Sequence, residues 1–236
     1  MIPKIIHLCW FSNDPFPVEI KVCLDSWKKI LPDYEVKHWT YEDAVNLHIP
    51  YVEQALKARK WAFAADVVRF AAVYQEGGIY MDSDILLYRR FDDLLENRGL
   101  TTFNEKNRPD KDVFGLQAAF FWGEKGNTFC KDMIDYYSSR PFLRPDGTYD
   151  ETISPFVMLE TARRYGYKNE DVEQHLDGLH VYPTYLVSPS KTYKRHKDAI
   201  GKHCIYGSWR KRKWGRRLEI KLKHLWNVVK YAIDKR

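Results

Sequence analysis

A helix-length segment with almost no polar residues is the strongest constraint on the fold of this chain. From Trp61 to Tyr74, only Asp66 and Arg69 interrupt a run of apolar and aromatic side chains. A helix of this composition has no solvated face, so other elements must enclose it on nearly every side. The sequence therefore predicts a central buried helix. Because Asp66 and Arg69 are three residues apart, they should lie on one face of it.

Short strands and helices alternate along the rest of the chain. Apolar runs bounded by polar residues predict strands, and apolar residues at steps of three and four predict helices. The expected strands span residues 4–11, 34–39, 79–81, 85–88, 116–122, 179–182 and 203–206; the expected helices span residues 18–31, 61–74, 127–139 and 154–165, with two short helices after Thr40 and from Pro50. Strands alternating with helices in this order predict an α/β fold.

Length and charge divide the chain into one globular domain and a basic tail. At 236 residues with 44% hydrophobic content, the chain can fill one core but not two enzyme domains. Residues 210–236 hold eleven lysines and arginines against Glu219 and Asp234, whereas the whole chain has a net charge of +6. We therefore expect a mildly acidic domain over residues 1–209 and a separate basic tail over residues 210–236.

The cysteines and the N-terminus favour a reduced, cytoplasmic setting. The four cysteines match neither a zinc pattern nor a dense disulfide framework, so buried free thiols are expected. Residues 1–10 lack the long apolar core of a signal peptide, and no stretch reaches the length of a transmembrane helix.

Two carboxylates follow a predicted strand, directly after the Gly77-Gly78 helix stop. Ile79 to Met81 lead into Asp82-Ser83-Asp84, and residues two apart in an extended segment point to the same side. One hard divalent cation such as Mg²⁺ or Mn²⁺ could lie between the two carboxylates and bridge them to a diphosphate. A solvated Asp-x-Asp turn is the alternative, but the preceding strand and helix stop favour the metal site.

Four further residues are candidates for ligand binding. Asp66 and Arg69 could form a structural ion pair, but burying two charges costs roughly several kcal/mol each, which favours a ligand-binding pair. His203 could complete the coordination of a borderline ion such as Mn²⁺, although a lone histidine is more often structural. Trp10 ends the first strand, where its ring could stack on a nucleobase or pack in the core.

Several of these segments together resemble the retaining glycosyltransferase family with a DXD-containing sugar-binding region. That family includes bacterial capsule and lipopolysaccharide enzymes and yeast initiating mannosyltransferases. The matching residues, in family order, are Ile2 to His7 with Trp10-Phe11, Ser26-Trp27, Ala62 to Arg69, Gly77 to Asp84, and His203 with Ser208-Trp209.

The resemblance implies a GT-A fold, with a mixed central sheet flanked by helices, and a nucleotide-diphosphate sugar donor. It implies that Asp84 holds the metal, with Asp82 near the ribose and sugar, and that Asp66 and Arg69 grip the transferred sugar. In the related clostridial glucosylating toxins, the tryptophan corresponding to Trp10 stacks on uracil, which favours UDP as the donor nucleotide.

The resemblance also adds His7, Ser208 and Trp209 to the expected donor-binding residues. One position departs from the family pattern, because Ala65 stands where a serine usually precedes the helix aspartate. A serine contact to the donor is therefore absent or replaced.

The implied reaction is hexosyl transfer with retention of the anomeric configuration. The acceptor hydroxyl attacks from the face on which the diphosphate leaves, and a phosphate oxygen takes the proton. Glu105, Asp150 and Glu151 are possible acceptor-side residues that no spacing argument separates. The expected acceptor is a glycan or lipid-linked glycan in surface polysaccharide synthesis.

Two other functions share some of these sequence features. An aspartate-nucleophile phosphatase also places Asp-x-Asp after an apolar strand, but typically has Thr or Val where this chain has Leu86, and carries the motif on its first strand. A membrane-binding or nucleic-acid-binding module would use the basic tail and leave the buried Asp66 and Arg69 unexplained. We expect no nucleic-acid partner.

The tail itself combines basic clusters with a helical apolar stripe. Its basic residues begin with Arg210 to Lys213, and its apolar residues recur at steps of three and four: Leu218, Leu222, Leu225, Trp226, Val229 and Ile233. Such a helix can lie flat on an anionic membrane surface, or pack against the domain or a second copy. The tail thus predicts a cytoplasmic enzyme held peripherally on the inner face of the cell membrane.

Overall fold

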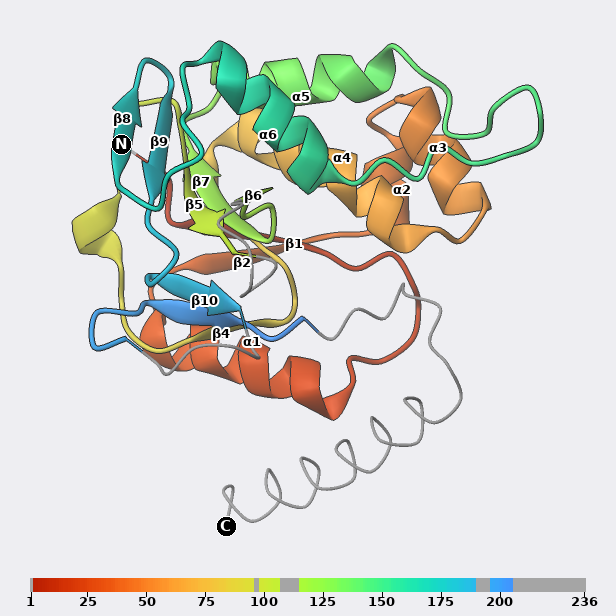
Figure 1. Ribbon diagram of the computed structural model, residues 1–236. Helices are drawn as coiled ribbons and strands as arrows, with labels where there is room; N and C mark the ends of the chain where they lie inside the picture. The colour runs from red at the N-terminus through yellow and green to blue at the C-terminus, as the bar shows by residue number, and fades with distance from the viewer. Residues whose placement is uncertain (1, 96–97, 107–114, 190–195, 206–236) are drawn as a thin grey trace, which may run out of the picture.

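A mixed β-sheet lies at the centre of the computed structural model, which describes residues 2–95, 98–106, 115–189 and 196–205 (Figure 1). Its strand order within these ranges is β2-β1-β3-β7-β5-β9-β8, and β6 pairs with β5. The strands are β1 (Ile5–Cys9), β2 (Glu35–Trp39), β3 (Gly78–Met81), β5 (Leu100–Glu105), β6 (Gly115–Leu116), β7 (Phe120–Gly123), β8 (Gln174–Leu176) and β9 (Leu179–Tyr182).

The sheet contains both parallel and antiparallel pairs. β1 runs parallel to β2 and β3, and β5 runs parallel to β9. β7 lies antiparallel between β3 and β5, and β8 is antiparallel to β9. A smaller sheet of order β10-β11-β4 consists of β4 (Ile85–Leu87), β10 (Val187–Pro189) and β11 (Gly201–His203). The expected mixed α/β architecture is therefore confirmed.

Helices cover both faces of the large sheet (Figure 1). On one side lie α2 (Tyr41–Val45), α3 (Pro50–Lys57), α4 (Trp61–Glu76), α5 (Thr128–Ser138) and α6 (Ser154–Arg164). On the other side lie α1 (Val18–Ile30) and the small sheet, and a short 3₁₀ helix (Asp92–Leu94) follows β4. Each side has its own apolar core, one built around Phe70 and Phe121 and the other around Trp27 and Trp122.

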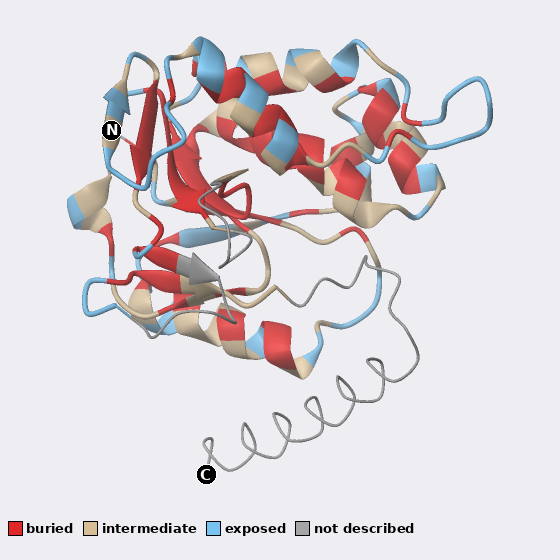
Figure 2. Cartoon of the chain, viewed as in Figure 1, coloured by how far each residue is buried: buried red, intermediate tan, exposed pale blue. Residues whose placement is uncertain are grey.

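Helix α4 is the buried central helix that its composition predicts. Val67, Val68 and Phe70 are completely inaccessible to solvent, and Figure 2 shows buried residues along most of the helix. Burying one such side chain contributes about 1.5–3 kcal/mol. Because α4 packs against α3, α5 and strands of the sheet, it is a rigid platform for the two charged residues that it carries.

The Gly77-Gly78 pair lets the chain pass from α4 directly into β3. Both glycines have positive φ, +69° and +105°, which favours residues without a Cβ. A Cβ at Gly78 would also come within 2.8 Å of the carbonyl oxygen of Ile5 on β1. This close approach seats β3 beside β1, so the strand that precedes Asp82 enters the middle of the sheet.

Several strands differ from the expectations. The predicted strand over 116–122 is two strands, β6 and β7, because residues 117–119 leave the ladder to make hydrogen bonds with side chains. The strand predicted over 203–206 lies over Gly201–His203 instead. β5, β8 and β10 were not predicted, since β5 and β8 alternate little in hydrophobicity and β10 is only three residues long.

The basic tail, residues 210–236, lies outside the described residues, as do Ser208 and Trp209. The boundary between a domain ending at residue 209 and a tail beginning at residue 210 therefore stays a prediction. Over the part of the chain that the structure describes, no helix has the length and apolarity needed to cross a bilayer.

Candidate active site

Asp82-Ser83-Asp84 forms a turn between the two sheets. The Asp82 carbonyl accepts a hydrogen bond from Ile85 N at 3.0 Å, and Asp82 N donates to the carbonyl of Ala119 at 2.8 Å. The expectation that the chain stays extended through both carboxylates is wrong, because β3 belongs to the large sheet and β4 to the small one. The turn places the two aspartates at the junction of the sheets.

Pairing within the small sheet brings His203 to these aspartates. β11 runs antiparallel to β4 with His203 opposite Ile85, the residue that follows Asp84. One potential ligand atom from each of Asp82, Asp84 and His203 lies within 4.8 Å of the others. His203 Nε2 is 3.5 Å from Asp84 Oδ1, and the two side chains are only 16% and 13% exposed. The three residues proposed as metal ligands therefore converge.

Glu105 lies on the other side of the His203 ring. Its Oε1 is 3.4 Å from His203 Nδ1 and accepts a hydrogen bond from Gln117 Nε2 at 3.2 Å. Burial disfavours the imidazolium, but Asp84 and Glu105 outweigh it and raise the pKa of His203 well above its ordinary value. A carboxylate behind a histidine orients the ring for a metal and makes it a stronger ligand. The sequence led us to expect Glu105 only on the acceptor side, whereas in the structure Glu105 lies beside the His203 ring.

Arg69 uses its guanidinium to connect α4 with the turn. Nε donates to the carbonyl of Ala65 at 2.9 Å, and Nη1 donates to the carbonyl of Ala118 at 2.8 Å. Nη2 lies 3.1 Å from Asp66 Oδ1 and 3.6 Å from Asp82 Oδ1. The buried pair Asp66 and Arg69 thus extends to the first aspartate of the motif, and Arg69 is fixed with its charge beside Asp82.

Asp66 is also held by the start of α6. Ser154 Oγ donates to Asp66 Oδ1 at 2.6 Å, and Ser154 N donates to Asp66 Oδ2 at 3.2 Å. A carboxylate at the N-terminus of a helix is stabilised by the helix dipole and by the unpaired N–H groups there. Burial raises the pKa of Asp66, whereas Arg69 and the Ser154 hydrogen bonds favour its charged form.

Tyr80 supports Asp82 from the preceding strand. Its hydroxyl donates to Asp82 Oδ1 at 2.6 Å, and its ring lies 5.0 Å from the guanidinium carbon of Arg69. Burial raises the pKa of Tyr80 well above its ordinary value, so the phenol keeps the proton that it donates. Neither Tyr80 nor Ser154 was singled out from the sequence, since a tyrosine on a core strand and a serine before a helix are common.

Ser26 and Trp27 of α1 hold the strand that leaves the turn. Trp27 Nε1 donates to the carbonyl of Ile85 at 2.7 Å, and Leu87 N donates to Ser26 Oγ at 3.0 Å. Two side chains in adjacent positions thus bind the backbone of β4. The family resemblance includes Ser26 and Trp27 but assigns no role to them. In the structure they hold β4 and so help to position Asp84.

Trp10 lies at the same edge of the sheet as Asp82. β1 and β3 are parallel, with His7 opposite Tyr80, so the residues that follow both strands emerge at one edge. The Trp10 indole is partly exposed, donates from Nε1 to the carbonyl of Asp14 at 3.0 Å, and lies 4.8 Å from the ring of Phe16. One end of the ring is therefore anchored, while the side chain stays accessible at the ligand edge of the sheet.

His7 does not lie where it could contact a donor. Its side chain is fully buried; Nδ1 accepts from Trp39 Nε1 at 3.1 Å and Nε2 donates to the carbonyl of Gly77 at 2.7 Å. Burial lowers the pKa of His7, which keeps the ring neutral as these two bonds require. The expectation that His7 binds the nucleotide is therefore corrected: the ring joins β1 and β2 to the glycine turn.

Parts of this sequence are similar to known proteins. Residues 17–101 match the model of the glycosyltransferase sugar-binding region containing the DXD motif. An uncharacterized glycosyltransferase of Acanthamoeba polyphaga mimivirus is 26% identical over 219 residues, which cover 89% of this chain and 84% of the viral protein. An inositol phosphoceramide mannosyltransferase of Schizosaccharomyces pombe is 35% identical over 101 residues, which cover 40% of this chain and 27% of the yeast protein.

Among solved structures, the PaToxG glycosyltransferase aligns with a TM-score of 0.56 at 21% identity, over 69% of each chain. Its similarity supports the fold, which is of the GT-A type. The matched region contains Asp66, Arg69, Asp82 and Asp84, the residues that the structure brings together. The expected resemblance is confirmed: residues 17–101 resemble the glycosyltransferase sugar-binding region containing the DXD motif, and the fold is of the GT-A type.

Proposed function

We propose that this chain transfers a hexose from a UDP-hexose, such as UDP-glucose or UDP-galactose, to a hydroxyl of a glycan or lipid-linked glycan, with retention of configuration. The observation that carries the proposal is the convergence of Asp82, Asp84 and His203 beside the buried Arg69 and Asp66. The product would be a surface polysaccharide of the capsule or lipopolysaccharide type.

The possible ligand atoms of this cluster suit a divalent cation. Two carboxylates and one imidazole are ligands for Mn²⁺, and a cation with more oxygen ligands such as Mg²⁺ would use Asp82 and Asp84. Glu105 provides the outer partner that metal-binding histidines usually have. The bound cation would neutralise the donor diphosphate and stabilise it as a leaving group.

The residues beside the cluster suit recognition of the transferred sugar. Asp66 and Asp82 offer acceptors to sugar hydroxyls, and Arg69 sets the position of both carboxylates through its ion pairs. The family resemblance assigns the sugar to Asp66 and Arg69, with Asp82 near the ribose and sugar. The side chain of Asp82 is 29% exposed, whereas those of Arg69 and Asp66 are 7% and 9% exposed, so Asp82 is the most accessible of the three to a donor. In this proposal Asp82 contacts the donor, and Arg69 holds Asp82 in position.

In the proposed reaction, the acceptor hydroxyl attacks the anomeric carbon from the face on which the diphosphate leaves. A new bond forms between the acceptor oxygen and the anomeric carbon, the bond from that carbon to the diphosphate breaks, and a phosphate oxygen takes the acceptor proton. The three acceptor-side carboxylates named from the sequence each contact another side chain. Glu105 lies against His203, Asp150 pairs with Arg144, and Glu151 pairs with Lys60. The proposed mechanism uses no covalent enzyme intermediate.

A donor-hydrolysis screen tests the reaction class and the donor together. UDP-glucose, UDP-galactose, their N-acetyl forms and GDP-mannose are each incubated with the protein, with Mn²⁺, with Mg²⁺ and with EDTA. We expect metal-dependent release of UDP from one UDP-hexose. Preference for GDP-mannose would overturn the assignment of the base, and full activity in EDTA would overturn the metal.

Replacing Trp10 with alanine should weaken UDP binding by about 1–3 kcal/mol, because the loss of a stacked ring costs about that much per base. The measurement is UDP titration by calorimetry in the presence of Mn²⁺. Trp10→Phe is the matched variant: it keeps an aromatic face and should recover most of the affinity. Unchanged UDP affinity in a folded Trp10→Ala protein would assign the ring to packing against Phe16.

We further propose that residues 210–236 hold the enzyme on the inner face of the cell membrane. The tail lies outside the described residues, so the proposal rests on its sequence alone: eleven basic side chains next to a helical apolar stripe. Each basic residue near an anionic surface contributes about 1 kcal/mol. An enzyme held in this way would meet a lipid-linked acceptor in two dimensions.

Deleting residues 210–236 should abolish sedimentation with anionic liposomes. The intact chain should sediment with liposomes containing phosphatidylglycerol at low salt, and high salt should weaken this binding because the attraction is electrostatic. Neutral phosphatidylcholine liposomes provide the control. If the intact chain ignores anionic liposomes even at low salt, the tail packs against the domain or another copy instead.

A further inference from the structure

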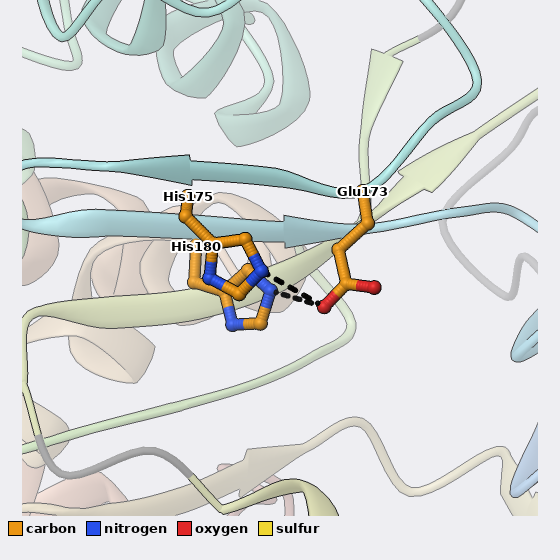
Figure 3. Close-up of side chains that lie close together, drawn as sticks. All are labelled: Glu173, His175 and His180. Carbon is orange, nitrogen blue, oxygen red and sulfur yellow. Dashed lines mark hydrogen bonds and ion pairs between the residues drawn. The ribbon is translucent and has the colours of Figure 1, made fainter.

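A second cluster of possible metal ligands lies at the edge of the large sheet, on β8 and β9. Figure 3 shows the side chains of Glu173, His175 and His180 pointing toward one another. Glu173 Oε1 is 3.2 Å from His175 Nε2 and 3.0 Å from His180 Nε2. The two imidazole rings are stacked, with their centroids 4.1 Å apart.

The local sequence explains why these three side chains meet. Glu173 and His175 are two residues apart, so they share one face of the extended segment that leads into β8. Asp177-Gly178 closes a two-residue hairpin, in which Gly178 has φ +79°. The resulting register places His175 directly opposite His180, where side chains on the same face are in contact.

We propose that Glu173, His175 and His180 bind a divalent cation of borderline softness, with Zn²⁺ as the best match. Two imidazoles and one carboxylate are ligands that suit Zn²⁺. Bonds of about 2.0–2.1 Å in a tetrahedron place ligand atoms roughly 3.3 Å apart. The Glu173 oxygen lies close to this spacing from both Nε2 atoms. The rings are stacked at 22°, so the exposed His175 ring would have to turn out of the stack to aim its Nε2 at the same ion as His180, and a water would complete the tetrahedron.

The protein around the cluster is organised to hold its ligands in place. The loop before Glu173 is fixed by hydrogen bonds between the Gln174 side chain and the backbone of Lys168, and by Asp171, which accepts from Thr184. His180 is 3% exposed and packs on the ring of Tyr182, with centroids 4.2 Å apart. The His180 side chain therefore has little freedom to lose on binding a metal, and the backbone that carries Glu173 is held in place.

An ion can reach the cluster from solvent. The side chain of His175 is 63% exposed, and a surface pocket is lined by both histidines and by Arg98. Arg98 is exposed, so water and salt screen its repulsion of an incoming cation. A site with a solvent path and a preformed ligand set meets the requirements for metal binding in a folded chain.

This site is separate from the cluster at Asp82 and Asp84. β8 is the last strand of the large sheet, whereas Asp82 follows β3 near its middle. A metal bound to Glu173, His175 and His180 would fasten the edge strand β8 and the preceding loop to β9. Its expected effect is to stabilise the hairpin, and it does not depend on the proposed donor or acceptor.

Zinc titration of the full-length chain tests the proposal. Asp84→Ala serves as the parent, because it removes a ligand from the other cluster. Calorimetry with metal-free protein and ZnCl₂ should show one bound Zn²⁺ per chain, and Zn²⁺ should raise the Tm. His175→Ala should weaken binding by about 100-fold or more, since loss of even an outer partner of a ligand costs about 10–100-fold. The same substitution should remove the rise in Tm.

Two further variants make the result specific. Glu173→Gln keeps the size of the side chain and should also weaken Zn²⁺ binding, because a neutral amide is a poor ligand. His48→Asn removes an exposed histidine far from the hairpin in the sequence, at a left-handed position that asparagine tolerates, and should leave binding unchanged. The proposal is overturned if the parent binds no Zn²⁺, or if His175→Ala binds Zn²⁺ as tightly as the parent.

Discussion

Replacing Asp84 with alanine is expected to abolish sugar transfer and metal-dependent UDP binding. The substitution removes one carboxylate from the three side chains that converge at the turn, and it leaves the donor diphosphate without full charge compensation. Stabilisation of developing charge by a metal amounts to several kcal/mol, so turnover should fall by about 1000-fold or more. Steady-state transfer assays and UDP calorimetry with Mn²⁺ measure the two losses.

Asp82→Asn should distinguish the role of Asp82 from that of Asp84. The asparagine can still accept the hydrogen bond from Tyr80, but it loses the charge that faces Arg69. We expect most turnover to disappear while part of the UDP affinity survives. Asp93→Ala provides the matched control, because Asp93 is an exposed aspartate in an ion pair with Arg89 and should be nearly neutral. Normal Mn²⁺-dependent turnover in Asp84→Ala would refute the metal-binding role of this residue.

The parts of the fold that depend on one continuous segment could be predicted from the sequence. The composition of residues 61–74 requires enclosure on nearly every side, and most of α4 is buried. Gly77-Gly78 marks the end of the helix, because the left-handed backbone there and the approach of β1 both exclude a side chain. Such features require no knowledge of the neighbouring elements in space.

Features that depend on distant pairing could not be predicted. The segment after Asp84 is a continuous apolar run that looks like a continuation of the core strand, yet β4 pairs with β11, more than a hundred residues further along the chain. Only that pairing brings His203 to Asp84 and places Glu105 behind the imidazole. The sequence pointed to His203 by resemblance, but it contained no local signal for the carboxylate that orients it.

Burial by itself does not distinguish a structural residue from a ligand-binding one. His7 and Asp66 both lie in segments that match the family, and both are buried. The two nitrogens of His7 are fully used by Trp39 and Gly77, which assigns His7 to the fold. Asp66 is joined through Arg69 to the partly exposed Asp82, so its contacts lead toward the candidate site.

Replacing Arg69 with lysine should sharply reduce sugar transfer although the positive charge is kept. The planar guanidinium reaches four groups at once: two backbone carbonyls, Asp66 and Asp82. A lysine ammonium is a compact charge that cannot reproduce this fork. We expect kcat to fall by about 100-fold, with UDP affinity much less affected, because Asp84 and His203 are not contacted by Arg69. The lost hydrogen bonds should also lower the free energy of unfolding by about 1–3 kcal/mol.

The split between kcat and UDP affinity distinguishes a positioning role from a purely structural one. A structural role would lower the yield and Tm of the variant but leave the kcat of the folded fraction unchanged. Arg90→Lys is the matched control, since Arg90 also pairs with two aspartates, Asp33 and Asp92, but is 43% exposed and should lose little stability or activity. Wild-type kcat in folded Arg69→Lys would show that Asp66 and Arg69 only connect α4 to α6 and to the loop before β7, and that the sugar is held by other residues.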